Sequence, residues 1–267
     1  MLIKNLQDFN LRHIFECGQC FRWNADENGV YTGVAGDYVI KCENTADGVM
    51  ISCPDDLYIT DYFDLNRDYT EIKNSFGSDE ILKKACEFGS GIRILKQDPW
   101  ETMISFIISA NNNIPRIKKI IELLCTNFGE KLDDVHYKFP GAETLAGLTE
   151  EDLAVIRSGF RAKYIIDAAR KTAEGKLDLS KLYSLPSAEA RAVLKGVKGI
   201  GDKVADCILL FAYGKYDVFP KDVWIKRILN NLYHVENADF DSFVTEKFGG
   251  FGGFAQQYLF FYGREFI

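Results

Sequence analysis

The sequence predicts an α+β fold, in which an N-terminal antiparallel β-sheet domain is followed by an all-α body. Short runs of β-branched and aromatic residues, separated by glycine-containing turns, occupy the first quarter of the chain. From about residue 79 the apolar residues recur at helical spacing instead. No internal repeat, low-complexity run or flexible linker interrupts the 267 residues. We therefore expect a sheet domain over residues 1–80 and a helical domain over residues 81–267.

Four runs are predicted to form the strands of the sheet: Cys20–Trp23, Val30–Val34, Tyr38–Ile40 and Val49–Ile51. The connections between them contain Asn28-Gly29, Gly36-Asp37 and Asp47-Gly48. These dipeptides suit hairpin turns because their residues tolerate positive φ. After Pro54 the strand pattern weakens.

The first long helix is predicted to start at Asp98, which has the form of an N-cap followed by Pro99 at the first helical position. Three asparagines at 111–113 should end it. The next helix has an apolar face, because isoleucines and a leucine at 117, 120, 121 and 124 recur at helical spacing. Further helices are expected over residues 164–174, 187–195, 202–213, 223–233 and 254–263.

Composition and charge exclude two classes of protein. With 47% hydrophobic and 27% charged residues the chain is not a disordered protein. Its formal net charge of −7 argues against a DNA-packaging protein, which would be strongly positive. A local basic region remains, because residues 157–227 hold 15 Lys and Arg against 8 Asp and Glu. Such a region suits a phosphate-binding face, although an unevenly charged solvated surface would have the same composition.

The start of the chain and its cysteines suggest where the protein works. The polar start has no apolar signal core, and no later segment is apolar enough to span a bilayer. The seven cysteines are odd in number and scattered, which suits reduced thiols. We expect an intracellular monomer without membrane contact, in the cytoplasm or nucleoid of a prokaryote or the nucleus of a eukaryote.

The strongest local signal is a glycine-rich loop between two short helices, a helix-hairpin-helix at 187–213. Ser187 follows a proline and is predicted to cap the first helix, and glycines at 196, 199 and 201 form the loop. Loop amides beside a helix N-terminus form a ready site for a phosphate oxygen. Gly199 and Gly201 are therefore candidate contacts to a DNA backbone, because a Cβ would hinder close approach. The alternative is a helical hairpin that glycine merely stabilises.

Two ionisable residues flank this loop. Lys203 lies in the first turn of the second helix, where the positive end of the helix dipole disfavours a cation and so favours a nucleophilic amine. Asp206, one turn further on, should oppose that effect. Asp222 opens the next helix as a predicted N-cap, and its carboxylate could also stabilise positive charge developing on a sugar. The alternative for Lys203 is one more phosphate contact.

At these residues the chain resembles the helix-hairpin-helix DNA glycosylase superfamily and, more closely, the eukaryotic-type 8-oxoguanine DNA glycosylase/lyase family. The matching segments occur in family order and span nearly the whole chain: 18–23, 97–99, 111–117, 159–164, 199–207 and 255–260. The resemblance implies a two-part helical glycosylase body with the active-site cleft between its parts. It also implies a base excision repair enzyme that flips 8-oxoguanine out of duplex DNA, preferably opposite cytosine. Such an enzyme excises the base and cleaves the abasic strand by β-elimination through a lysine Schiff base.

The family motifs also imply roles for individual residues. Lys203 would be the nucleophile, and Asp222 would be the carboxylate that assists it. The Gly18 carbonyl would accept a hydrogen bond from the N7 hydrogen of the lesion. Cys207 and Phe260 would stack on the two faces of the base, and Gln256 would bind its Watson–Crick edge. Asn111, Arg116 and Arg161 would contact the orphaned cytosine, with Phe160 as the wedge. Taken singly, each has a plainer alternative. These are a turn at Gly18, core packing for Cys207 and Phe260, and a solvated amide for Gln256. Asn111 could belong to a polar loop that ends a helix, and the arginines could face solvent.

Three positions depart from the family pattern. Phe160 stands where a tyrosine is usual, so any contact from that hydroxyl is absent. Trp224 replaces a histidine common in eukaryotic members, and Asp202 precedes the lysine where a neutral residue is usual. The tryptophan puts local phosphate or active-site contacts in doubt, but none of the three removes the chemistry.

Cofactors and other protein classes can be weighed on the same residues. No cysteine follows Cys207, which excludes the superfamily branch with a C-terminal iron–sulfur cluster. The scattered histidines predict no zinc site, so we expect that no cofactor is required and that the hairpin leaves room for a structural cation. The expected partner is double-stranded DNA containing 8-oxoguanine. A non-catalytic DNA-binding protein and an enzyme acting on free nucleosides are the alternatives, and Lys203 with Asp222 and the basic region argue against them.

Overall fold

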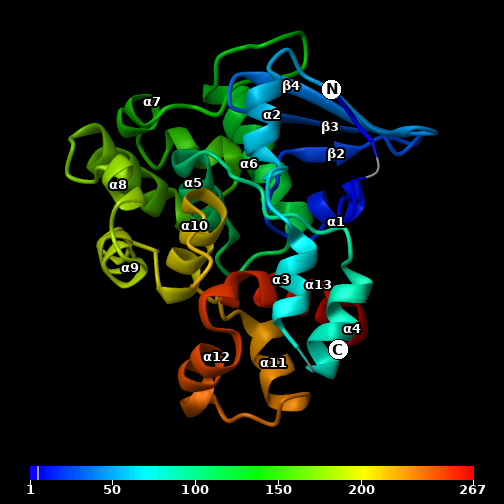
Figure 1. The fold of residues 1–267 in the computed structure, drawn as a ribbon. Coiled ribbons are helices and arrows are strands. Elements are labelled where there is room, and N and C mark those ends of the chain that lie inside the picture. The colour runs from blue at the N-terminus through cyan, green and yellow to red at the C-terminus, as the bar shows by residue number, and fades with distance from the viewer. Residues whose placement is uncertain (5, 78) are drawn as a thin grey trace.

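The computed structural model describes residues 1–4, 6–77 and 79–267, and it confirms an α+β fold with a five-stranded sheet beside a larger helical body (Figure 1). The strands are β1 (Leu2–Ile3), β2 (Trp23–Ala25), β3 (Tyr31–Ala35), β4 (Tyr38–Thr45) and β5 (Gly48–Ser52). They pair antiparallel in the order β1-β5-β4-β3-β2. The hairpin into β5 needs its glycine, since a Cβ on Gly48 would lie 2.1 Å from the Ile3 carbonyl oxygen.

The helices of the first 90 residues are α1 (Leu11–Phe15), α2 (Asp56–Tyr62), α3 (Tyr69–Ser75) and α4 (Glu80–Phe88). The remaining helices are α5 (Pro99–Ser109), α6 (Ile114–Phe128), α7 (Ala142–Ala146), α8 (Ala162–Ala173), α9 (Ser187–Lys195), α10 (Asp202–Tyr213), α11 (Val223–Asn231), α12 (Phe240–Phe248) and α13 (Gly252–Phe266). None of the helices in the described ranges is both long and apolar enough to cross a membrane.

The N-terminal part departs from the prediction in several places. Strand β1 and helix α1 were not predicted, and α2 and α3 also precede residue 79, where the helical pattern was expected to begin. These helices are five to seven residues long, which is too short to show a helical period. The aspartate N-caps of α2 and α3, Asp55 and Asp68, were the available local signal. The strand predicted at Cys20–Trp23 starts only at Trp23, because Phe21 turns into the helical core and Arg22 pairs with Glu101 of α5 at 3.0 Å.

The helical part follows the prediction closely. Asp98 caps α5 by accepting a hydrogen bond from the Glu101 amide at 2.8 Å, and α6 buries its apolar face. The helices α9 and α10 have the expected bounds. One cap is wrong: Ser187 makes no cap bond and instead donates to the Asp217 carboxylate at 2.6 Å. Helices α7 and α12 were not predicted.

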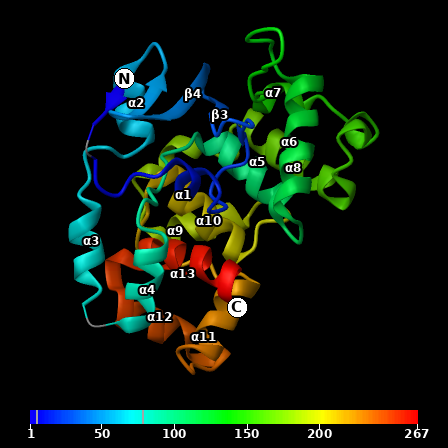
Figure 2. The ribbon, with the colours of Figure 1, turned by 90° about the vertical axis from the view of Figure 1, so that its right-hand side faces the viewer.

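Two hydrophobic cores organise the molecule. The smaller lies under the sheet and α1–α2, and the larger fills the helical body. Helix α10 is buried along most of its length and packs on α5 and α9. Figures 1 and 2 show α6–α8 on one side of α10 and α11–α13 with α3 and α4 on another. Because its N-terminal turn faces the junction of these parts, α10 can present a side chain between them.

Candidate active site

A cavity of about 350 Å³ lies at this junction. Its walls come from the segment between α1 and β2, from α5, α6 and α10, from the start of α11 and from the second half of α13. The lining residues are Gly18, Phe21, Phe106, Ser109, Asn112, Asn113, Ile114, Pro115, Ile117, Lys203, Asp222, Trp224, Phe260 and Arg264. Tertiary packing thus brings together four of the residues predicted from sequence: Gly18, Lys203, Asp222 and Phe260.

Lys203 projects from the first turn of α10, for which Gly201 is the N-cap. Its side chain is half-buried, and Nζ lies 5.4 Å from the centre of the Phe106 ring. Asp206, which was expected to oppose the effect of the helix dipole on this amine, is paired with another cation: its carboxylate accepts a hydrogen bond from Arg191 Nε at 2.6 Å. That partly buried pair joins α9 to α10, and Asp222 is the carboxylate that lines the cavity together with Lys203.

Asp222 is confirmed as the N-cap of α11, since its Oδ1 accepts a hydrogen bond from the Ile225 amide at 2.8 Å. Burial raises the pKa of this carboxyl group, and the Ile225 amide and the charges of Lys203 and Arg264 partly offset that effect. One side chain therefore caps a helix and places a carboxylate in the cavity that the Lys203 amine also lines.

The four residues expected to hold the base are all close to this cavity or buried behind it. Gly18 has φ +83° and contacts Phe260, whose Cε1 would lie 2.9 Å from a Cβ on Gly18. Cys207 and Gln256 are buried and do not line the cavity. Burial raises the pKa of Cys207 to about 11, so its thiol stays neutral. Among the described residues Gln256 Oε1 has no hydrogen-bond partner, which is unusual for a buried amide.

The residues expected to face the opposite strand lie around the end of α5. Arg161 is not the solvent-facing side chain of the plainer alternative: it is buried, and it donates to the carbonyls of Ala110, Asn111 and Ser158. Burial and the nearby charge of Arg116 lower the pKa of Arg161, so the two guanidinium groups are close.

The wedge and its neighbours are exposed. Phe160 is 51% exposed, with the Arg161 guanidinium 4.4 Å from its ring centre. Arg116 is also exposed, and Asn111 lies in the left-handed region at φ +51°. These residues form an exposed group outside the cavity, with Arg161 held beneath it.

Sequence reasoning assigned no role to Phe106 or Arg264, which both line the cavity. Arg264 lies one helical turn after Phe260, its guanidinium is 5.5 Å from that ring, and it donates to the Glu16 carbonyl at 3.0 Å. The i, i+4 spacing from Phe260 was the signal that could have found it. Trp224, noted as a departure from the family, also lies in the wall.

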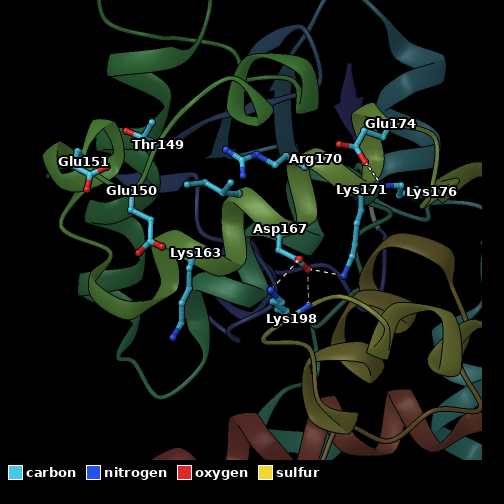
Figure 3. Close-up of a pocket in the computed structure, with 11 residues that line it drawn as sticks. Thr149, Glu150, Glu151, Lys163, Asp167, Arg170, Lys171, Glu174, Lys176 and Lys198 are labelled. Carbon is cyan, nitrogen blue, oxygen red and sulfur yellow. Dashed lines mark hydrogen bonds and ion pairs between the residues drawn. The ribbon is translucent and has the colours of Figure 1, made fainter.

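The hairpin loop is anchored from α8. A larger, open hollow of about 760 Å³ lies beside it, lined by Thr149, Glu150, Glu151, Lys163, Ile166, Asp167, Arg170, Lys171, Glu174, Lys176 and Lys198 (Figure 3). Figure 3 shows Asp167 between Lys171 and Lys198, and its Oδ2 accepts from the Lys198 amide at 2.9 Å and from Lys171 Nζ at 2.8 Å. Asp167 thus ties the hairpin loop to α8, and a second ion pair in this hollow joins Glu174 to Lys176 at 2.6 Å.

The two loop glycines differ in their surroundings. Gly199 has φ +86°, and a Cβ there would lie 2.5 Å from Cδ2 of Tyr164. A Cβ on Gly201 would meet nothing within 4 Å, so this position is open on the side where a ligand could approach. No group of three metal-ligating side chains with suitable geometry occurs in the parts of the chain that the structure describes.

Comparison with known proteins gives matches over the whole chain. A family model described as the N-terminal domain of 8-oxoguanine DNA glycosylase matches residues 1–103, and a model of the HhH-GPD superfamily of base excision DNA repair proteins matches residues 104–249. The N-glycosylase/DNA lyase of Saccharomyces cerevisiae is 39% identical over 160 residues, which is 54% of this chain but only 43% of that protein's length.

Two solved structures are similar over nearly their full length. The Clostridium acetobutylicum 8-oxoguanine glycosylase/lyase, in complex with double-stranded DNA containing cytosine opposite to 8-oxoguanine, is 44% identical with a TM-score of 0.94. That match covers 99% of this chain and 94% of the other. A structure of MBOgg1 in complex with a low affinity DNA ligand is 48% identical, also with a TM-score of 0.94, and the match covers 99% and 95% of the two chains.

Proposed function

The chain belongs to the 8-oxoguanine DNA glycosylase/lyase family of base excision repair enzymes, and we propose that it removes 8-oxoguanine from opposite cytosine through a Schiff base formed by Lys203. The observation that carries this proposal is the meeting of Lys203, Asp222 and Gly18 in one cavity. An amine, a carboxylate and an available carbonyl are the groups that the chemistry needs. Because the target base is stacked inside a duplex, it must first be flipped into this cavity.

The proposed reaction begins with the unprotonated Lys203 Nζ attacking C1′ of the flipped nucleotide. The bond from C1′ to N9 breaks, the base leaves with the electron pair, and a proton from the amine returns to the base. Asp222 stabilises the positive charge that develops on the sugar. The bond from C1′ to O4′ then breaks, O4′ takes a proton from water, and the nitrogen forms a protonated imine with C1′. Water accepts a proton from C2′, a C2′–C3′ double bond forms, and the 3′ phosphate leaves with the electron pair of the C3′–O bond.

The proposed enzyme would distinguish 8-oxoguanine from guanine by the hydrogen bond that each base can make to the Gly18 carbonyl. Oxidised guanine carries a hydrogen on N7, whereas guanine has a lone pair there. The Gly18 carbonyl can accept a hydrogen bond from oxidised guanine but not from guanine. Leaving this carbonyl without a partner would weaken the binding of guanine by ~1–3 kcal/mol. The unpartnered Gln256 carbonyl is available for the opposite edge of the base, and Phe260 and Cys207 supply its two faces.

The preference for cytosine would come from Arg116 and Arg161, whose guanidinium donors match the carbonyl and ring nitrogen of that base. Arg161 must exchange some of its bonds to the carbonyls of the α5 end for bonds to the base. Phosphates of the duplex would bind at Gly199 and Gly201. We propose further that one chain suffices and that no cofactor is required, although the hairpin leaves room for a structural cation. The enzyme would work in the compartment that holds the cell's DNA.

Borohydride trapping tests the mechanism. The native protein should become covalently linked to a duplex containing 8-oxoguanine, and Lys203→Gln should bind the duplex but neither excise nor trap. Lys198→Gln is the matched control, because Lys198 is an exposed lysine of the same hairpin. Undiminished trapping by the Lys203 variant would place the nucleophile elsewhere.

A further inference from the structure

The carbonyls around Gly18 are held by side chains from distant parts of the chain. The Glu16 carbonyl accepts from Arg264 at 3.0 Å, and the Cys17 carbonyl accepts from Gln257 Nε2 at 2.7 Å. The Gln19 carbonyl accepts from Gln97 Nε2 at 2.8 Å. Within the described residues the Gly18 carbonyl accepts no such bond. Three of four successive carbonyls are therefore occupied, and the free one belongs to the residue that lines the cavity.

The Gln19 side chain anchors the same segment from the other direction. Its Nε2 donates to the carbonyls of Ile14 and Arg93, both at 2.8 Å, and its Oε1 accepts from the Leu95 amide at 2.8 Å. Gln19 is completely buried, so these bonds do not compete with water. These hydrogen bonds hold the segment around Gly18 against residues 93–95, which lead into α5.

This anchoring matters because Gly18 is a glycine in the left-handed region, at φ +83°. Glycine populates both signs of φ, so the peptide that carries its carbonyl could rotate if its neighbours were free. Gln257 holds the peptide before Gly18, and Gln97 holds the peptide after Gln19. With both ends held, the intervening carbonyl has one orientation.

We propose that Gln257, Gln97 and Gln19 form a clamp that orients the Gly18 carbonyl, and that recognition of the lesion base depends on this clamp. The proposal rests on the function proposed above. The three glutamines are positioning residues, since none of them lines the cavity. A hydrogen bond weakens steeply when its angle falls below about 120°, so a rotated carbonyl would lose the N7 hydrogen that distinguishes the lesion.

The role of Gln257 is separable from that of its neighbour Gln256. Both side chains are buried on α13. Gln257 Nε2 donates a hydrogen bond to the Cys17 carbonyl, whereas Gln256 Oε1 has no hydrogen-bond partner among the described residues. A change at Gln257 therefore disturbs the backbone that reads the base and leaves the side chains of the cavity in place.

The test compares two activities of one protein. Excision of 8-oxoguanine requires the base to be read, whereas cleavage of a preformed abasic site uses the same amine without any base. Gln257→Leu keeps the size of the side chain and removes the donor. We expect its single-turnover excision of 8-oxoguanine to fall by about 10- to 100-fold, with abasic-site cleavage within about twofold of native.

Two further variants complete the design. Gln7→Leu makes the same chemical change at an exposed position and should leave both activities native. Gln97→Leu removes the second bond of the clamp and should show the same split, so the question is answered even if Gln257→Leu does not fold. Unchanged excision in both clamp variants, or an equal loss of both activities, overturns the proposal. A native protein that acts on neither substrate instead contradicts the proposed function itself.

Discussion

Replacing Asp222 separates its role as a helix cap from its role as a charge. In Asp222→Asn the amide oxygen can still accept from the Ile225 amide, because asparagine caps helices about as well as aspartate. In Asp222→Ala the cap is lost, at a cost of about 1 kcal/mol. For a chain of this size that cost lowers the melting temperature by roughly 2–4 °C. The two variants should therefore differ in stability, with the asparagine variant close to native.

The activities of the two variants should instead be alike. Both lack the carboxylate that faces Lys203 in the cavity, and loss of one such electrostatic contact slows catalysis by about 10²- to 10³-fold. Single-turnover excision of 8-oxoguanine measures the rate, and thermal melting measures the stability of the same samples. DNA binding serves as the control, because neither change touches the hairpin loop.

The pH dependence gives an independent check. Catalysis needs the ionised carboxylate, and burial raises the pKa of Asp222 above its ordinary value. The native rate should therefore show a fall that depends on Asp222 as the pH is lowered through that raised pKa. Asp222→Asn should lack this Asp222-dependent fall and keep only the loss of rate that follows from protonation of the attacking amine. The reasoning fails if the asparagine variant keeps the native rate, or if it is destabilised as much as the alanine variant.

Two paired substitutions test the DNA interface. Arg161→Ala should cost about 2–3 kcal/mol of stability, because it leaves buried carbonyls without a charged donor, whereas Arg116→Ala should cost almost none. Both should reduce excision opposite cytosine relative to excision opposite adenine, and equal excision opposite all bases by native protein would contradict the assignment. Gly199→Ala should lower the unfolding free energy by at least about 2 kcal/mol, since its Cβ would collide with Tyr164 at positive φ. Gly201→Ala should cost under about 1 kcal/mol yet weaken binding to every DNA sequence, and unweakened binding would exclude a phosphate site there.

Local signals in the sequence were enough to predict the helical body. Asp98 and Asp222 are caps whose hydrogen bonds reach only three residues along the chain, so they can be recognised without a fold. The glycine loop and Lys203 are equally local. Local signals fail where a side chain bonds to a distant residue. Ser187 is a residue type that often caps helices, but its hydroxyl donates to Asp217, thirty residues away. Asp206 likewise stands one turn from Lys203 but is paired with Arg191 of the preceding helix.

By itself the sequence determined the class of fold, the helix-hairpin-helix and its lysine, because hydrophobic spacing, capping and glycine content act over a few residues. Only the tertiary structure decided which carbonyl stays free and which arginine is buried. Gln257, which binds the carbonyl of the residue before Gly18, lies 240 positions from that residue, Cys17, in the chain. Such contacts depend on how separate elements pack, and burial then decides which polar groups must find partners and which remain available for a substrate.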